Sequence, residues 1–512
     1  MRLSDTHRVR SGSRSKILAA AIMMSLGTAS VHADELSDLR QRLDAQEQQI
    51  RALEQKLEAR EAGGTTTTDT AKLEEQEQQI RVLERKFELQ QEANEAAAKS
   101  AATAKASPKG FSLASADGRN VVKFKGNFAF DGRWFLDDVT PDTADTWLLR
   151  KVRPAFEGTL YGIFDFRLQP DFAGGKSIIL DAYAAARLRP WAVIQAGKFK
   201  GPVGLERLQA DQFNRFMELG LPSQLVPNRD MGVQWSGAAG KGVFTWQLGY
   251  FNGATDGIST DSNSSPDVDN DGEKQWQGRV FTNPFAQSDI YALRNLGFGI
   301  GGSYGDRLGS PTSPLLASVR TPGQQSISVY RTNTATSPLN NATYADGDSV
   351  RWSPQLYYSW NNFGLLSEYV ESSQDVSRQI SATETRSDTI DNTAWQVQLA
   401  WFLTGEDESY SSFDTQNPFR VNAPGWGAWE LVARYHELHV DDAAFIGGAN
   451  SFSDPARTPR SISAVGVGLN WYLNQNVKWQ LDYEVARFDG GAAGGADRGD
   501  EKSLFTRFAL TF

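Results

Sequence analysis

The sequence predicts an all-β membrane protein: a transmembrane β-barrel of about sixteen antiparallel strands with an inward constriction loop, preceded by an N-terminal α-helical coiled coil. Three observations lead to this fold class. From Val121 to Phe512, apolar and charged residues alternate with a period of two, as in a strand with one apolar and one polar face. Many of these segments reach the roughly ten residues of a tilted membrane strand, whereas soluble strands usually have about five or six. The chain also combines 46 Gly with 14 Trp, 14 Tyr and 28 Phe, which suits a membrane barrel.

The overall composition excludes several other classes of protein and site. The 512-residue chain has a formal net charge of −10 and a mean hydropathy of −0.46, which is too polar for a helical membrane protein. After residue 30 no apolar run reaches the roughly 18 residues of a spanning helix. The absence of cysteine rules out a disulfide framework, thiolate catalysis and a cysteine-based zinc site. We expect no cofactor and no nucleic-acid partner.

Residues 1–33 are predicted to be a signal peptide. Its basic front consists of Arg8, Arg10, Arg14 and Lys16. An apolar stretch at 17–27 and the small-residue cleavage site Val31-His32-Ala33 follow. The mature chain would then begin at Asp34; the alternative is an uncleaved anchor. Export favours the periplasm, the outer membrane or secretion, and we predict the bacterial outer membrane with the N-terminal arm in the periplasm.

Residues 34–95 are predicted to form a periplasmic coiled coil. The segment EQQIRALEQKLEAR at 47–60 is repeated as EQQIRVLERKFELQ at 77–90. The stretch GGTTTTDT between the two copies is expected to interrupt the helix. Apolar residues recur at alternating spacings of three and four, namely Leu36, Leu39, Leu43, Ile50, Leu53 and Leu57, then Leu73, Ile80, Leu83 and Phe87. Gln46 and Gln76 fill d positions, where a polar residue specifies register or oligomer state. Each coil has only about three heptads and is marginal alone, so we expect an arm on an oligomer axis. The alternative is a solvated helix that pairs with nothing, and residues 96–118 are predicted to be a linker.

The predicted barrel occupies residues 119–512. Its last segment alternates up to a terminal Phe512, which resembles chains that are assembled into bacterial outer membranes. Short turns such as 237–240 alternate with long polar stretches such as 306–347 and 374–390, as short periplasmic turns and long outer loops do in barrels. A soluble β-sandwich would show the same alternation, but the length of the strands argues against it.

One stretch, from Gly197 to Asp230, does not alternate. It mixes Gly, Pro, Phe, Leu and charged residues and is too apolar for a solvated linker. A segment of more than about 20 residues without regular structure is usually functional. We predict that it folds into the barrel and narrows the lumen; the alternative is a long surface loop or a pair of short helices.

The polar faces of the early strands and this loop are locally basic although the protein is acidic. The predicted pore-lining, anion-binding residues are Lys123, Lys125, Arg133, Lys151, Arg153, Arg167, Arg187, Lys198, Lys200, Arg207, Arg215 and Arg229. The same strand faces carry only Asp131, Glu157, Asp165 and Asp181. Rings of Lys and Arg in a pore select anions, and Arg suits phosphate geometry. The alternative is a mixed lumen in which the charges pair off.

Two other patterns are weaker candidates for chemistry. His436 and His439 are three residues apart in a strand pattern, so they face opposite sides and cannot share a metal ion. The run from Asp267 to Gly272 resembles the start of a calcium loop, but Gly278 stands where an EF-hand needs Glu. We therefore predict neither an enzyme nor a built metal site.

Several separate motifs resemble the phosphate-selective porin O/P family. They are LLRKVRPAFEGTLYGIFDFRLQPDF at 148–172, GKFKGPVGLERL at 197–208, LVPNRDMGVQWSG at 225–237, FGLLSEYV at 363–370 and WQVQLAWFLTGED at 395–407. The resemblance covers about residues 110–512. It implies a sixteen-stranded, trimeric outer-membrane porin with an inward constriction loop and basic residues around the eyelet.

The sequence thus predicts a passive channel for small anions such as phosphate or polyphosphate, embedded in outer-membrane lipid as a homotrimer. One alternative is a general or cation-tolerant porin. An alternative of another class is a structural tether, in which the coiled coil contacts the cell wall and the barrel is only an anchor.

Overall fold

The structure is a computed structural model, and it describes residues 67–136, 144–175, 177–257, 269, 271–332, 341–381 and 383–512, with isolated residues 45, 48, 52 and 55. The chain divides into two compact units, residues 1–101 and residues 102–512. The predicted signal peptide and most of the first copy of the coil sequence lie outside the described residues. In the described part, no helix is both long and apolar enough to cross a membrane.

The second copy of the coil sequence lies in helix α2 (Thr67–Ser100). The heptad residues Ile80, Leu83 and Phe87 are partly buried, whereas Val82 and Leu89 on other faces are about half exposed. The helix is longer than the heptad pattern and includes residues 96–100. The remainder of the stretch predicted as a linker contains the strands β1 (Thr103–Ser107) and β2 (Gly110–Ala114).

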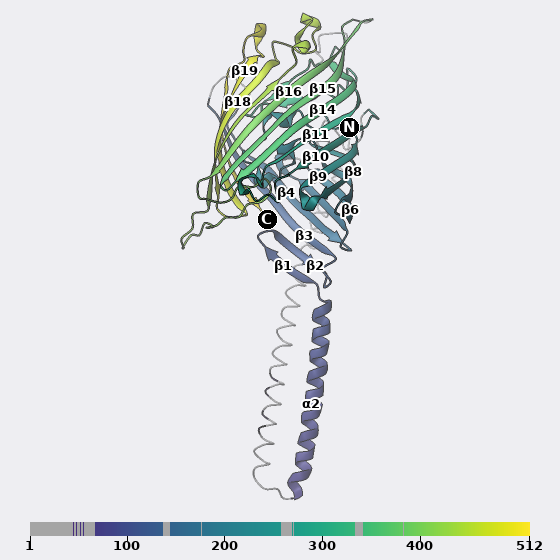
Figure 1. Ribbon diagram of the computed structural model, residues 1–512, viewed down its shortest axis with the longest axis vertical. Helices are drawn as coiled ribbons and strands as arrows, with labels where there is room; N and C mark the ends of the chain where they lie inside the picture. Colours follow the sequence, from purple (N-terminus) through teal and green to yellow (C-terminus); the bar gives the residue numbers. More distant parts are fainter. Residues whose placement is uncertain are drawn as a thin grey trace, which may run out of the picture. The chain divides into compact units, whose positions relative to one another are not determined.

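The second unit contains one antiparallel sheet of eighteen strands, of which β1 and β2 form a hairpin and the other sixteen close a barrel (Figure 1). The barrel strands are β3 (Val121–Phe135), β4 (Thr146–Leu160), β5 (Phe164–Asp171), β6 (Ile178–Arg189), β7 (Ala192–Lys200), β8 (Arg229–Ala239), β9 (Phe244–Phe251), β10 (Gln275–Thr282), β11 (Gly297–Leu308), β14 (Thr343–Trp360), β15 (Phe363–Gln379), β16 (Thr385–Phe402), β17 (Ala428–His439), β18 (Pro459–Tyr472), β19 (Val477–Gly490) and β20 (Glu501–Thr511). Each strand pairs with the next, and β20 pairs with β3 to close the ring. The predicted sixteen-stranded barrel is confirmed.

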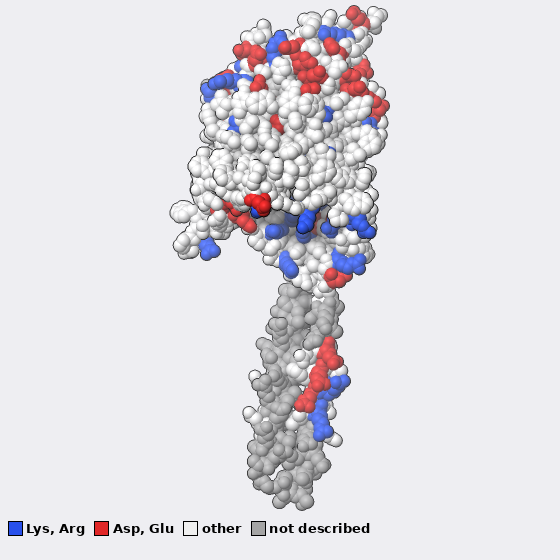
Figure 2. Space-filling model, viewed as in Figure 1, with Lys and Arg blue, Asp and Glu red and all other residues white. Residues whose placement is uncertain are grey.

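Strand residues alternate between a buried inner face and an exposed apolar outer face. On β15 the inner residues Leu366, Glu368 and Val370 are buried. Two of the three are apolar, so the inner face is not uniformly polar. Aromatic side chains line the outer face, and Trp429 and Trp471 stack there with ring centroids 5.1 Å apart. On the face shown in Figure 2, a band of mostly uncharged residues crosses the barrel, and charged side chains gather above and below it. Such a band is typical of a membrane barrel.

The two ends of the barrel differ in their connections. We call the end where β3 begins and β20 stops the terminus end, and the opposite end the loop end. At the terminus end several turns are very short, for example 161–163 and 361–362, as predicted. The connections 283–296 and 403–427 at the same end are long, so the prediction of short turns fails for these two.

The barrel closes at a seam around Phe512. β20 pairs with residues 127–135 of β3, and β2 pairs with residues 121–124 along the same strand. Between them, the backbone N–H and C=O of Phe512 each bond to Gly126 at 3.0 Å. A Cβ on Gly126 would lie 2.5 Å from the ring of Phe512, so glycine is required beneath this ring.

An apolar core lies inside the barrel toward the loop end. Its members come from the segment after β7, from the hairpin of β12 (Ser318–Arg320) and β13 (Ser326–Ser328), and from the segment after β17. Examples from the three are Leu225, Ile327 and Phe452. They pack against inner-face residues of β15–β19 such as Ile390 and Ile462.

Candidate functional site: the constriction

The constriction loop, residues 201–228, lies inside the barrel. It contains three short helices, α3 (Leu205–Leu208), η2 (Asp211–Phe213) and η3 (Leu221–Gln224). Most of its apolar side chains are buried, and Phe216 is only 1% exposed. The prediction of an inward loop is confirmed, although Gly197–Lys200 and Arg229–Asp230 belong to β7 and β8.

Side chains of the barrel wall satisfy the backbone of this loop. The N–H groups of Met217 and Leu221 donate to Asp482 at 2.6 Å and to His436 Nδ1 at 3.0 Å. Wall donors reach loop carbonyls in the pairs Asn470–Arg215, Lys478–Asn214 and Arg507–Met217, at 2.8, 2.8 and 2.6 Å. Buried backbone groups must be paired, and these bonds explain how an irregular segment keeps one position inside a pore.

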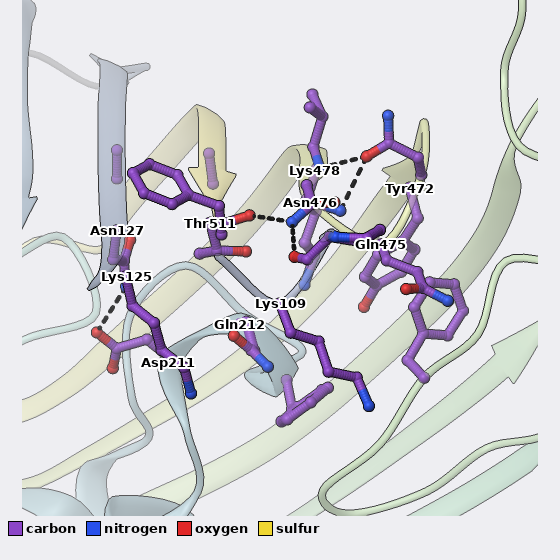
Figure 3. Close-up of a pocket in the computed structure, with 18 of the residues that line it drawn as sticks. Lys109, Lys125, Asn127, Asp211, Gln212, Tyr472, Gln475, Asn476, Lys478 and Thr511 are labelled. Atoms are coloured by element: carbon purple, nitrogen blue, oxygen red, sulfur yellow. Dashed lines mark hydrogen bonds between the residues drawn. The ribbon is translucent and has the colours of Figure 1, made fainter. Parts of the chain in front are cut away.

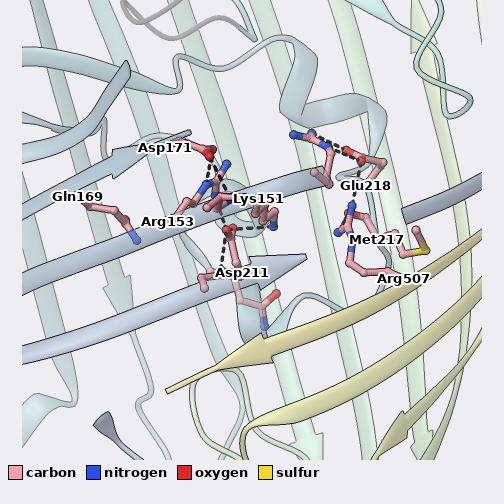
Figure 4. A network of polar contacts seen from close by, with 12 residues as sticks. Lys151, Arg153, Gln169, Asp171, Asp211, Met217, Glu218 and Arg507 are labelled. Carbon is pink, nitrogen blue, oxygen red and sulfur yellow. Dashed lines mark hydrogen bonds and ion pairs between the residues drawn. The ribbon is translucent and has the colours of Figure 1, made fainter. Parts of the chain in front are cut away.

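Three arginines of the barrel wall form ion pairs with Glu218 next to the closing seam. The Glu218 carboxylate lies 2.6 Å from Arg133, 2.9 Å from Arg150 and 3.2 Å from Arg507. Arg133 and Arg507 also contact Asp131, at 3.1 and 2.7 Å. Three cations therefore share two carboxylates at this point, and Figure 4 shows Glu218 beside Arg507. Burial alone would raise the pKa of Glu218, but the arginines outweigh it and hold the pKa well below its ordinary value.

Asp211 forms the second contact between the loop and this wall (Figure 4). Its carboxylate accepts from Arg153 at 2.5 Å and lies 3.0 Å from Lys151, while Arg153 also bonds Asp171 at 2.6 Å. Burial would raise the pKa of Asp211, but Lys151, Arg153 and Lys200 outweigh it and hold the pKa well below its ordinary value. Asp211 is therefore charged at any physiological pH.

Four further predicted cations, Lys125, Arg167, Arg187 and Arg229, lie in ion pairs. Glu157 contacts Lys125 at 2.5 Å and Arg167 at 2.6 Å. Asp181 contacts Arg167 at 3.3 Å and Arg229 at 2.7 Å. Arg187, nearer the terminus end, pairs with Asp165 at 2.7 Å. Pairing is thus more extensive than the sequence pattern suggested.

Three predicted cations have no carboxylate oxygen within 4.0 Å among the described residues: Lys123, Lys200 and Arg207. Lys123 is exposed, Lys200 Nζ donates to the carbonyl of Gln209 at 3.0 Å, and Arg207 donates to the carbonyl of Ser223. Burial lowers the pKa of Arg207 to about 10, which leaves it charged. Lys198 is buried at 2% exposure.

The last predicted site residue, Arg215, faces a second segment, residues 403–427 at the terminus end, of which Glu406 and Glu408 are buried. Arg215 pairs with Glu408 at 2.5 Å. The hydroxyl of Tyr410 donates to the carbonyl of Leu205 at 2.7 Å, and Gln209 donates to the carbonyl of Tyr410 at 2.8 Å. This segment therefore supports the constriction loop from the terminus end.

Replacing Glu408 with Ala is expected to loosen that support. It leaves the Arg215 guanidinium buried without its ion pair, and breaking a buried pair costs about 3–5 kcal/mol. We expect increased current noise in single-channel recordings. Asp407→Ala is the control because Asp407 is exposed; equal noise in both variants would contradict a supporting role.

A cavity of about 360 Å³ lies on the terminus-end side of the loop (Figure 3). Its charged lining consists of Lys109, Lys125, Lys151, Lys478, Arg507, Asp211 and Asp414. The uncharged polar part of the lining includes the amides of Asn127, Gln475 and Asn476. Basic groups outnumber acidic ones, so an anion that enters from this end meets a favourable field.

Sequence reasoning missed several residues of the constriction. Arg150 was missed because a β-bulge puts two residues, Arg150 and Lys151, on the inner face: Ala129 pairs with Lys151 but Phe130 pairs with Leu149. Arg507 lies on the polar face of the terminal strand and could have been found by alternation alone. Strands β15, β17 and β19 contribute a further set, namely Glu368, Glu430, Arg434, Asp482 and Glu484.

The weaker candidates can also be placed. His436 is fully buried on the inner face and His439 is exposed, which confirms that they face opposite sides. Of the predicted calcium-like run, residues 267, 268 and 270 lie outside the described residues, and Asp269 accepts backbone N–H bonds from Asp271 and Gly272. Among the described residues, no three His, Asp or Glu side chains are grouped to hold a metal ion.

Comparison with known proteins agrees with this architecture. A family model described as phosphate-selective porin O and P matches residues 122–512. The chain belongs to this family. Porin O of Pseudomonas aeruginosa is 28% identical over 151 residues, which span 29% of this chain and only 31% of that porin. An uncharacterized protein of Caulobacter vibrioides is 23% identical over 489 residues, covering 93% of this chain and 90% of the relative.

Solved structures with a similar fold include two outer-membrane channels. An anion-selective porin from Comamonas acidovorans is 11% identical, with a TM-score of 0.44, and covers 77% of this chain and all of its own. The outer membrane channel DcaP of Acinetobacter baumannii is 10% identical, with a TM-score of 0.47, and covers 77% of this chain and 97% of its own.

Proposed function

We propose that this porin O and P family member is a passive diffusion channel of the bacterial outer membrane that favours small anions such as phosphate. The closed barrel supplies the passage, and the constriction loop narrows it. The observation that carries the proposal is the excess of cations where the loop meets β3, β4 and β20. There, three arginines share Glu218 and Asp131, and Lys151, Arg153 and Lys200 surround Asp211.

Charge pairing does not remove this preference. Glu218 and Asp211 of the loop are each shared by more than one cation, so the field stays positive where the loop meets β3, β4 and β20. In a narrow bore, a unit charge a few ångströms from an ion is worth about 1–4 kcal/mol, depending on the effective dielectric constant. A net excess of one or two charges is enough to separate anions from cations.

The decisive measurement is the zero-current potential of the purified protein in a lipid bilayer across a potassium chloride gradient. For a channel that favours anions, the zero-current potential has the same sign as the chloride equilibrium potential. Added phosphate should lower the chloride current if phosphate enters the same constriction. A potential near zero or of the opposite sign would support the general or cation-tolerant porin instead.

We further expect the full-length protein to be a homotrimer. The heptad stripe of α2, with Ile80, Leu83 and Phe87, supports self-association because short coils are marginal as single helices. Light scattering in mild detergent should report three chains per particle, and replacing Leu83 and Phe87 with Asp should weaken the assembly. A monomeric wild-type particle would contradict this expectation.

A further inference from the structure

The constriction loop is anchored to the wall opposite the cations by a buried glutamate on β15. Glu368 is 3% exposed. Its carboxylate accepts the backbone N–H of Leu205 at 2.7 Å and the backbone N–H of Glu206 at 3.3 Å. Among the described residues, Glu368 has no basic side chain within 4.0 Å, and its carboxyl group is directed at the backbone of the loop.

A second glutamate ties the loop to itself at the same place. Glu206, 1% exposed, accepts the backbone N–H of Gly220 at 2.8 Å, across 14 residues of chain. This bond joins helix α3, which contains Glu206, to Gly220 at the start of helix η3. It therefore links two separate parts of the loop.

Two glutamines of β16 connect the two carboxylates. Gln396 Nε2 donates to Glu368 at 2.7 Å and to Glu206 at 2.9 Å, and Gln398 Nε2 donates to Glu206 at 2.6 Å. The fit is close, because a Cβ on Gly220 would lie 2.1 Å from Gln396 Oε1. Buried carboxylates are tolerated only where donors satisfy them, and here backbone and amide donors from the loop and from β16 do so.

We propose that Glu368 is a positioning residue that fixes the constriction loop against the β15–β16 wall and thereby sets the width of the passage. This inference rests on the proposed channel function. The cations of β3, β4 and β20 hold the loop from one side, and Glu368 holds it from the other. Without Glu368, the N–H groups of Leu205 and Glu206 lose their acceptor, and the loop is no longer fixed at α3.

The test combines conductance with a chemical probe of loop position. The chain has no cysteine, so Ser223→Cys introduces a single thiol into the loop at a site that is 1% exposed. We expect Glu368→Ala to change the single-channel conductance and to speed modification of this thiol by a methanethiosulfonate reagent at least tenfold. Glu368→Gln keeps one acceptor oxygen and should show a smaller change in both measurements.

Glu371→Ala is the matched control, because Glu371 lies on the same strand but bonds the hydroxyl of Tyr369 instead of the loop. It should leave conductance and thiol modification at the values of the parent protein. If Glu368→Ala does not assemble, Gln396→Ala removes the donor shared by the two glutamates and is measured in the same way. Unchanged conductance together with a protected thiol in the assembled variant would overturn the proposal. A parent protein that conducts no ions would refute the channel function, while the thiol measurement alone would still decide whether Glu368 holds the loop.

Discussion

Deleting Phe512 is expected to lower the amount of assembled barrel in the membrane several-fold while the conductance of assembled channels stays the same. The deletion removes two backbone hydrogen bonds to Gly126 and the contacts of the ring with Phe111 and Phe124, at centroid distances of 6.0 and 5.8 Å. Hydrogen bonds contribute about 1 kcal/mol each. Full burial of a Phe contributes about 1.5–3 kcal/mol, and Phe512 is partly buried. The closing seam would therefore lose roughly 2–4 kcal/mol.

The conductance should be spared because the constriction is farther along β20. Arg507, which contacts Glu218 of the loop, is five residues before the end, or roughly 16 Å at the usual rise of a strand. Heat-modifiable mobility on gels measures assembly, and single-channel recording measures conductance.

Two substitutions sharpen this test. Gly126→Val should reproduce the assembly defect from the other side of the contact, because its Cβ would meet the ring of Phe512 at 2.5 Å. Phe508→Ala, which removes a half-exposed aromatic residue from the same strand, should have a smaller effect. Unchanged amounts of membrane-inserted protein after the deletion of Phe512 would show that the seam does not depend on its last residue.

The barrel could be predicted from the sequence because its signal is local. Alternation with a period of two is visible within each strand, and the pairing of each strand with the next follows the chain order. The constriction loop was also predictable, since it is the long apolar stretch that interrupts the alternation. The two long connections at the terminus end were not predicted, because the 403–427 segment is polar in composition and looks like an outer loop.

The sequence predicted many of the charged residues of the site, but it did not predict how they pair. Alternation identifies which residues face the lumen, but it does not identify their partners across the barrel. Glu218 lies 289 residues from Arg507, and only the folded loop brings the two together. The bulge at Arg150 reverses the alternation for one position, and no local feature of the sequence marks it.

The carboxylate pairs also change how a selectivity experiment should be designed. Arg153 bonds both Asp171 and Asp211, so replacing it removes one positive charge and also leaves two acids less compensated. Lys125 has the same relation to Glu157, whereas Lys123 is an exposed cation whose loss changes the field alone. Each of the three substitutions removes one positive charge, and at Arg153 and Lys125 the carboxylates that remain carry the resulting negative field into the passage.

We expect Lys123→Gln, Lys125→Gln and Arg153→Gln together to lower the anion-to-cation permeability ratio severalfold at low salt. A difference of about 1.4 kcal/mol is tenfold in occupancy, and this lies within the range of about 1–4 kcal/mol for a nearby charge. The effect should shrink near 1 M salt, where the screening length falls to about 3 Å. Arg457→Gln with Arg460→Gln is the control, since Arg460 is about half exposed and pairs with Asp442 beyond the end of β17.

Removing a negative charge from the constriction tests the sign of the effect on the permeability ratio. Asp211→Asn removes a negative charge from the point where Lys151 and Arg153 meet the loop, and it keeps the size and the accepting oxygen of the side chain. The anion-to-cation permeability ratio should therefore rise, while the triple variant lowers it. Both are read from the zero-current potential in the same potassium chloride gradient. If the potential stays unchanged in both variants, the ion path does not pass the cations of β3 and β4. If both variants shift it in the same direction, the shift comes from a displaced loop and not from the charge at the constriction.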